Sequence, residues 1–156
     1  MRFFLVDRVD ELIPGQSIRG VKAISLSEEY LHDHFPGHPL FPGTLMVEAL
    51  AQLGGFLVDV SHPEDPQQRA ILAQIDQARF SHPARPGDVL SLHCELSSSL
   101  GGAAQVEGRI LLGEQKVARA LLTFVLRAVD SPRVHEQRRE LYSLWTRHLE
   151  LDFAIR

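Results

Sequence analysis

The sequence is poor in cysteine, in aromatic residues and in uninterrupted apolar runs. Its 156 residues include one cysteine and one tryptophan, and aromatic residues make up 7% of the chain. The lone Cys94 cannot form a disulfide within the chain, which excludes a disulfide scaffold and fits a reducing compartment. The longest apolar run, residues 44–60, is interrupted by Glu48, Gln52 and two glycines. It falls short of the roughly 18 clean residues of a membrane-spanning helix, so we expect no membrane span.

A surplus of positive charge is also missing. The 16 basic residues are spread along the chain, and the 20 acidic residues give a net charge of -4. Nucleic acid is therefore not an expected partner. The first residues, "MRFFLVDRVDEL", have too short an apolar part and turn acidic too soon for a secretion signal. These features together predict a cytoplasmic protein.

Apolar residues are abundant enough for the core of one domain, at 44% of the chain. Several segments alternate or are rich in β-branched residues, and turn sequences such as "PGQ", "GG" and "GEQ" separate some of them. We predict a strand, or a strand with its lead-in, at residues 3–9, and further strands at residues 17–26, 70–80, 88–96, 103–111 and 115–128.

One long helix is predicted between these strands, from about Pro42 to about Val60. Pro42 suits a helix start, and the segment is apolar on nearly all sides, which is typical of a buried helix. The predicted class is α+β, an antiparallel sheet of about five or six strands curled around one central helix.

The C-terminal residues differ from the rest. We predict a domain over residues 1–130 and a helical extension over residues 131–156. Ser131 and Pro132 suit a helix start. An amphipathic face is predicted for this helix at Leu141, Leu144, Trp145 and Leu149. The sequence leaves open whether this face packs on its own domain or on a partner.

A thin polar stripe runs along the predicted central helix. Thr44, Glu48 and Gln52 are spaced by four residues, so they share one face. An unpaired carboxylate in apolar surroundings favours its protonated form, which suits a general acid. We therefore expect Glu48 to line a cavity, with Gln52 as its neighbour. The alternative is that the stripe faces solvent.

Three histidines, His32, His34 and His38, lie in the loop before this helix. They could bind a metal, satisfy backbone groups, or include a general base. The loop offers no cysteine and no evident fourth ligand, so we expect no metal. Gly43, at the helix start, would let a substrate oxygen approach unpaired backbone N–H groups. This combination suits proton abstraction beside a carbonyl, followed by loss of a β-hydroxyl.

The stretch "HFPGHPLFPGTLMVEALAQ", residues 34–52, closely resembles the signature HFPGxPxxPGxLxxEAxAQ of the hotdog-fold 3-hydroxyacyl-acyl-carrier-protein dehydratases of the FabZ type. Every fixed position matches. "FLVDRV" at 4–9 and "IDQARFSHPARPGDVL" at 75–90 are also similar to family segments. The resemblance covers residues 4–127 and implies a hotdog fold.

The resemblance implies roles for particular residues. His34 would be the base that removes the α-proton, Glu48 the acid that protonates the departing hydroxyl, and the Gly43 N–H the group that holds the thioester carbonyl. Arg79 and Arg85 would contribute to docking of the carrier protein. No metal and no cofactor is implied. The related FabA type, which also isomerises the double bond, has Asp at the position of Glu48, so isomerisation is not expected.

The resemblance also implies partners. The substrate would be attached to the phosphopantetheine of an acyl carrier protein, in fatty-acid or specialised lipid, polyene or polyketide synthesis. The catalytic His and Glu would meet across a homodimer interface, in a dimer or a trimer of dimers. Many family members carry a gating tyrosine where this chain has Ile71 or Leu72. Two alternatives stay open, a hotdog acyl-thioesterase and an inactive acyl-binding or scaffold subunit of a dehydratase complex.

Overall fold

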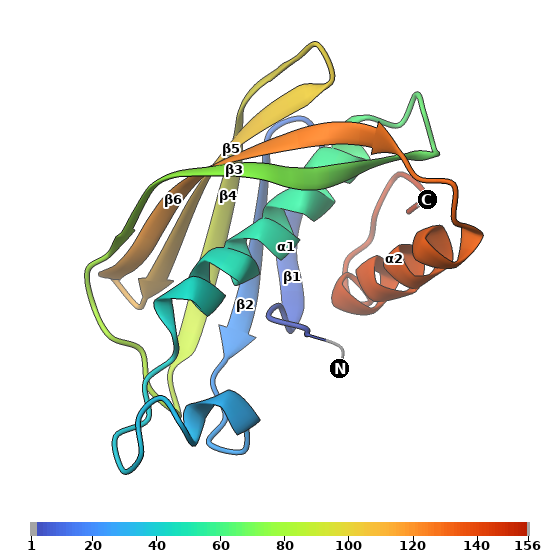
Figure 1. The fold of residues 1–156 in the computed structure, drawn as a ribbon. Coiled ribbons are helices and arrows are strands. Elements are labelled where there is room, and N and C mark those ends of the chain that lie inside the picture. The colour runs from blue at the N-terminus through green and yellow to red at the C-terminus, as the bar shows by residue number, and fades with distance from the viewer. Residues whose placement is uncertain (1–2, 156) are drawn as a thin grey trace.

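The structure, a computed structural model, describes residues 3–155 and consists of one sheet, two α-helices and a short 3-10 helix, Glu29–Leu31. Figure 1 shows the sheet wrapped around α1, with α2 to the right of α1, next to β1. The helices are α1 (Gly43–Ser61) and α2 (Pro132–Trp145). The strands are β1 (Arg8–Ile13), β2 (Ser17–Ala23), β3 (Gln68–Phe80), β4 (Val89–Leu100), β5 (Ala103–Leu112) and β6 (Gln115–Ala128).

The six strands form one antiparallel sheet in the order β1-β2-β4-β5-β6-β3. Tight turns join β1 to β2, β4 to β5 and β5 to β6, and glycines with positive φ occupy these turns at Gly15, Gly101 and Gly113. The pairing of β3 with β6 shifts register twice, between Leu72 and Gln74 and between Asp76 and Arg79. Such irregularities bend a strand, which helps the sheet to curl around α1.

The core lies between the concave face of the sheet and α1. Leu50, Leu53, Phe56 and Leu57 of the helix are 0% exposed, and each such side chain contributes about 1.5–3 kcal/mol when it leaves water. The helix approaches β5 closely, since a Cβ placed on Gly108 would lie 3.0 Å from a methyl carbon of Leu50. The predicted buried central helix is confirmed, with a start and an end within a residue of those expected.

Helix α1 is long and apolar enough by length and composition to cross a membrane, with a mean hydropathy of 1.3. However, 61% of that stretch is buried within the fold. Burial by its own sheet is the behaviour of the core helix of a globular domain.

Helix α2 packs on α1 through aromatic side chains. The rings of Phe56 and Tyr142 are stacked with centroids 3.9 Å apart, and Trp145 lies 5.9 Å from Tyr142. Tyr142 and Trp145 are buried in the same core cluster as α1. The extension thus packs on its own chain, which the sequence had left open.

The ladder of the first strand begins at Arg8, so residues 3–7 of the predicted segment 3–9 are its lead-in. Asp7 N–H already donates to the Val21 carbonyl of β2 at 2.8 Å.

One sequence prediction needs correction. The buried face of α2 does not contain Leu144, which is 55% exposed. The buried face contains Tyr142 instead, whose hydroxyl donates a hydrogen bond to Asp59 of α1. Tyr142 lies one turn after Arg138, so the two side chains share this face.

Candidate active site

The loop that carries His34 is held by its own backbone. The N–H of Leu40 donates to the His34 carbonyl at 2.7 Å, and Phe35 and His38 exchange two backbone hydrogen bonds of 3.0 and 2.8 Å. Gly37 permits the tight reversal between them with φ of +70°. The base of the loop is tied to the β3–β4 connection through Phe41 N–H and the Ala84 carbonyl, 2.8 Å apart.

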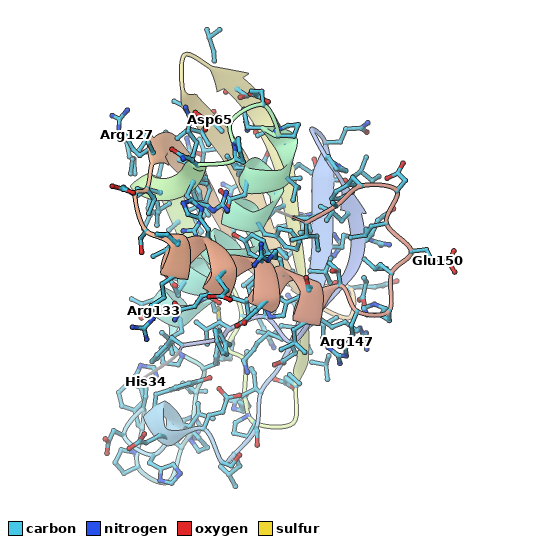
Figure 2. All side chains as sticks on the ribbon, turned by 90° about the vertical axis from the view of Figure 1, so that its right-hand side faces the viewer. His34, Asp65, Arg127, Arg133, Arg147 and Glu150 are labelled. Carbon is cyan, nitrogen blue, oxygen red and sulfur yellow. The ribbon has the colours of Figure 1, made fainter. Side chains whose placement is uncertain are left out.

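This loop orients the His34 ring. His34 is half-buried, and its Nδ1 lies 2.9 Å from the carbonyl oxygen of Leu40. Because a carbonyl oxygen can only accept, the neutral ring carries its proton on Nδ1. The lone pair is then on Nε2, the arrangement that a general base needs. Figure 2 shows His34 in the lower loop region, apart from α2. His32 and His38 are exposed.

The start of α1 lies beside His34. The N–H groups of Gly43 and Thr44 have no hydrogen-bond acceptor within residues 3–155, and such groups carry the positive end of the helix dipole. His34 and Gly43 line the same cavity of about 350 Å³, together with Phe80. A Cβ on Gly43 would lie 3.0 Å from the Phe80 ring, so a larger residue at this position would crowd that ring.

Glu48 lies on the side of α1 that faces away from the sheet. Its Oε1 accepts a hydrogen bond from Gln52 Nε2 at 2.9 Å. Gln52 is held in turn by the N-terminal segment, since its Oε1 accepts from Leu5 N–H at 3.0 Å and its Nε2 donates to the Phe3 carbonyl at 3.0 Å. The expected contact between Gln52 and Glu48 is therefore present.

The expected shielding of Glu48 is not present within one protomer. Glu48 is exposed, because the polar stripe lies on the open side of the helix, which the sheet does not cover. Glu48 nevertheless borders a cavity of about 280 Å³. This cavity is distinct from the one that His34 and Gly43 line. One protomer thus places His34 and Gly43 at one cavity and Glu48 at another.

The other predicted residues are at the surface or beside this second cavity. Arg79, on β3, and Arg85, in the turn before β4, are both exposed. Ile71 and Leu72, at the positions of the gating tyrosine in relatives, line the cavity that Glu48 borders. Among the residues that the structure describes, no three histidine, cysteine or acidic side chains gather as a metal-binding group.

Sequence reasoning missed a buried polar cluster near the other end of α1. Asp59, whose side chain is 4% exposed, accepts hydrogen bonds from Arg138 at 2.8 Å, Tyr142 at 2.7 Å and the Ala70 N–H at 2.7 Å. Burial, and next the Asp59 charge, raise the pKa of Tyr142 well above 10.0. The only local signal was an acidic residue in an apolar helix, the same signal that singled out Glu48.

The curled sheet around a long helix is shared with many solved structures, which define the class of this chain. A hot-dog-like protein from Thermanaerovibrio acidaminovorans has a TM-score of 0.63 at 18% identity and covers 90% of this chain and 96% of its own. A hypothetical thioesterase from Streptococcus pneumoniae, solved with coenzyme A, has a TM-score of 0.61 at 15% identity, covering 80% and 90%. The fold is therefore a hotdog fold.

The sequence defines the family within that fold. The model of the FabA-like domain matches residues 1–121, so the chain belongs to the FabA-like family. A 3-hydroxyacyl-[acyl-carrier-protein] dehydratase FabZ from Natranaerobius thermophilus is 40% identical over 122 residues, 78% of this chain and 85% of that one. The 3-hydroxyacyl-[acyl-carrier-protein] dehydratase FabZ from Pediococcus pentosaceus is 41% identical over 125 residues, which are 80% of this chain and 83% of that one.

Proposed function

We propose that this chain removes water from 3-hydroxyacyl thioesters carried by an acyl carrier protein, in fatty-acid synthesis. The observation that carries this function is about 40% identity to FabZ dehydratases over most of the chain, together with His34 and Glu48 in the matching signature. The product is a trans-2-enoyl thioester. A role in a specialised lipid, polyene or polyketide pathway would use the same chemistry.

Each step has a candidate residue. The Gly43 N–H at the start of α1 holds the thioester carbonyl oxygen as negative charge develops there. His34 Nε2 removes the α-proton, and Glu48 gives a proton to the β-hydroxyl, which leaves as water. Transfer of a proton from the imidazolium to the Glu48 carboxylate then restores both groups. Gln52 holds the Glu48 carboxyl in place.

We propose that the complete site contains His34 of one protomer and Glu48 of the next. The separate cavities for these residues support this arrangement. So does β3, a sheet-edge strand of 13 residues with Ile71 and Ile75 exposed at 43% and 48%. Unpaired apolar edges favour pairing with another chain. The assembly would be a homodimer or a trimer of such dimers.

The carrier protein is the proposed macromolecular partner, with the acyl group on its phosphopantetheine. Exposed Arg79 and Arg85 are proposed to meet its acidic surface. The chemistry requires no metal or cofactor. The proposed location is the cytoplasm, and the proposed division of the chain is a dehydratase-like unit over residues 1–130 with an extension over 131–156.

The two alternatives make different predictions. A thioesterase would release free thiol without an enoyl product, and a hydrolytic role would leave the match at His34 unexplained. An inactive scaffold subunit would need a partner for turnover. The intact His34 and Glu48 favour an active dehydratase over both.

Substitution of the two catalytic candidates tests the function. H34A and E48Q are each expected to lower turnover by about 10²- to 10⁴-fold, because each removes a positioned proton donor or acceptor. Enoyl absorbance measures turnover, and circular dichroism checks that both variants fold. Near-normal rates in both variants would contradict the assignment.

Mixing the two inactive variants tests the shared site. A heterodimer of H34A and E48Q contains one site with both changes and one intact site. After unfolding and joint refolding, random pairing should restore about a quarter of the wild-type activity. Two variants that stay inactive after mixing would show that each protomer uses its own His34 and Glu48.

A further inference from the structure

Helix α2 lies outside the residues that the family model matches, which end at residue 121. It nevertheless borders the cavity of about 280 Å³ that contains Glu48. A segment outside the matched residues thus forms part of the wall beside the proposed catalytic acid.

The cavity lies between two helical faces with the same spacing. On α1 the lining positions are Glu48, Ala51, Gln52 and Gly55, and on α2 they are Arg138, Leu141, Tyr142 and Trp145. Each set follows the i, i+3, i+4, i+7 pattern of one helix face. Each face therefore extends about 10 Å, at 1.5 Å per residue. Ile71, Leu72 and Phe124 from the sheet complete a largely apolar lining.

The α2 wall is held in place by buried contacts. Asp59 of α1 accepts hydrogen bonds from Arg138 at 2.8 Å and from Tyr142 at 2.7 Å. The Arg138 charge is thus matched by a carboxylate whose side chain is 4% exposed. The stacked rings of Phe56 and Tyr142 add apolar contact. These contacts place Leu141 and Trp145 at a defined position relative to Glu48.

The absence of a side chain at Gly55 leaves space in the cavity. Glycine inside a helix costs about 1 kcal/mol relative to alanine, and Gly55 has no positive φ that would require it. A Cβ at Gly55 would meet only the Phe124 ring, at an ordinary 3.5 Å. Packing within residues 3–155 therefore does not require glycine there, and the missing side chain enlarges the cavity.

We propose that the acyl chain of the substrate lies in this cavity, and that Leu141 and Trp145 of α2 set the length that fits. The proposal rests on the proposed dehydratase function, because Glu48 would then act at the mouth of the cavity while the apolar tail extends toward Gly55. The walls are apolar where the tail lies, and burial of each methylene there favours binding.

Substitutions that change the cavity test the proposal. G55L fills the far end, and the ratio of kcat/KM for long over short 3-hydroxyacyl thioesters should fall by about fourfold for each methylene that no longer fits. L141A widens the cavity and should raise the same ratio. L144A is the matched control on α2, since Leu144 is 55% exposed and outside the cavity. Unchanged ratios in both G55L and L141A, with normal wild-type turnover, would overturn the proposal.

Trp145 provides a second measurement that does not depend on turnover. It is the one tryptophan in the chain, and it is 2% exposed at the cavity wall. Titration of E48Q with a long-chain 3-hydroxyacyl-pantetheine should shift or quench its fluorescence, and a short-chain thioester should do so less. The proposal would be overturned if Trp145 fluorescence did not change with any thioester. It would also be overturned if the fluorescence changed only with protein concentration, which would indicate a second protomer in the cavity. If the wild type showed no dehydration of any thioester while the fluorescence response was present, the dehydratase function would be contradicted instead.

Discussion

Gly54 and Gly55 are adjacent in α1 and have different surroundings. A Cβ on Gly54 would lie 3.2 Å from Val106 Cγ1 and 3.4 Å from a Phe124 ring carbon. Gly54 therefore lets the helix approach the sheet. Gly55 lines the cavity beside Glu48, and a methyl group placed on its Cα would fit there.

This difference predicts opposite stability changes. G55A should raise the free energy of unfolding by about 0.5–1 kcal/mol, because alanine favours the helix. G54A gains the same propensity but crowds Val106, and overpacking costs about 1–3 kcal/mol. Urea unfolding of the two variants measures both values. The variants serve as each other's control, and equal stability would contradict the assigned contacts.

At the level of elements, α2 is attached to α1 through a buried carboxylate and a tyrosine. Burial and the neighbouring Asp59 charge raise the pKa of Tyr142 well above its ordinary 10.0, while Arg138 acts in the opposite direction on the tyrosine. The folded protein therefore keeps this phenol protonated at a pH where the unfolded chain has lost the proton.

The consequence is a specific alkaline sensitivity. As pH rises above 10.0, the unfolded state binds fewer protons than the folded state, so the free energy of unfolding falls. Y142F should lack this contribution. At neutral pH it should be about 1–2 kcal/mol less stable than the wild type, because it loses the hydrogen bond to Asp59. Urea unfolding across pH measures both effects.

The other tyrosine supplies the control. The buried hydroxyl of Tyr30 has no hydrogen-bond partner among the described residues, so Y30F breaks no such bond. Y30F should therefore be at least as stable as the wild type at neutral pH. A Y142F variant that loses stability with alkaline pH as steeply as the wild type would contradict the role given to Tyr142.

For the whole molecule, the two edges of the sheet differ. Strand β1 has six residues, and α2 lies next to it, whereas β3 has 13 residues and exposes Ile71, Ile75 and Phe80. Figure 1 shows β3 along the outer border of the sheet. A long apolar edge is the feature that a second protomer would cover.

A charge on this edge should prevent assembly. I75K is expected to yield monomers and, since His34 and Glu48 of one protomer line separate cavities, to abolish turnover. L100K is the matched control, because Leu100 is 87% exposed at the end of β4. Sedimentation velocity gives the oligomeric state. An active I75K monomer would contradict the shared site.

Much of the fold could be predicted from local patterns. The predicted strand at residues 115–128 agrees with β6, and α1 deviates by one residue at each end. The sequence left open how much of residues 3–9 is lead-in, because an apolar segment looks the same whether or not it has a ladder partner. Leu144 was misassigned because the helical period allows two neighbouring faces, and only contact with α1 selects one.

The Asp59 cluster could not be predicted. Its partners Arg138 and Tyr142 are 79 and 83 positions away in the chain, and no local pattern links residues at such separation. The separation of His34 from Glu48 into two cavities was also beyond local patterns. The resemblance had implied it through the expected dimer.

The order of residues in this chain determines the central helix and most strands, because helix period and strand alternation are properties of neighbouring residues. A long motif of neighbouring residues likewise selects His34, Gly43 and Glu48 as candidates for the site. The folded arrangement settles which side of α1 stays open and which face of α2 is buried. It also places Leu141 and Trp145 beside Glu48. Burial and cavity shape depend on contacts between distant segments, so they exist only once the sheet has curled around α1.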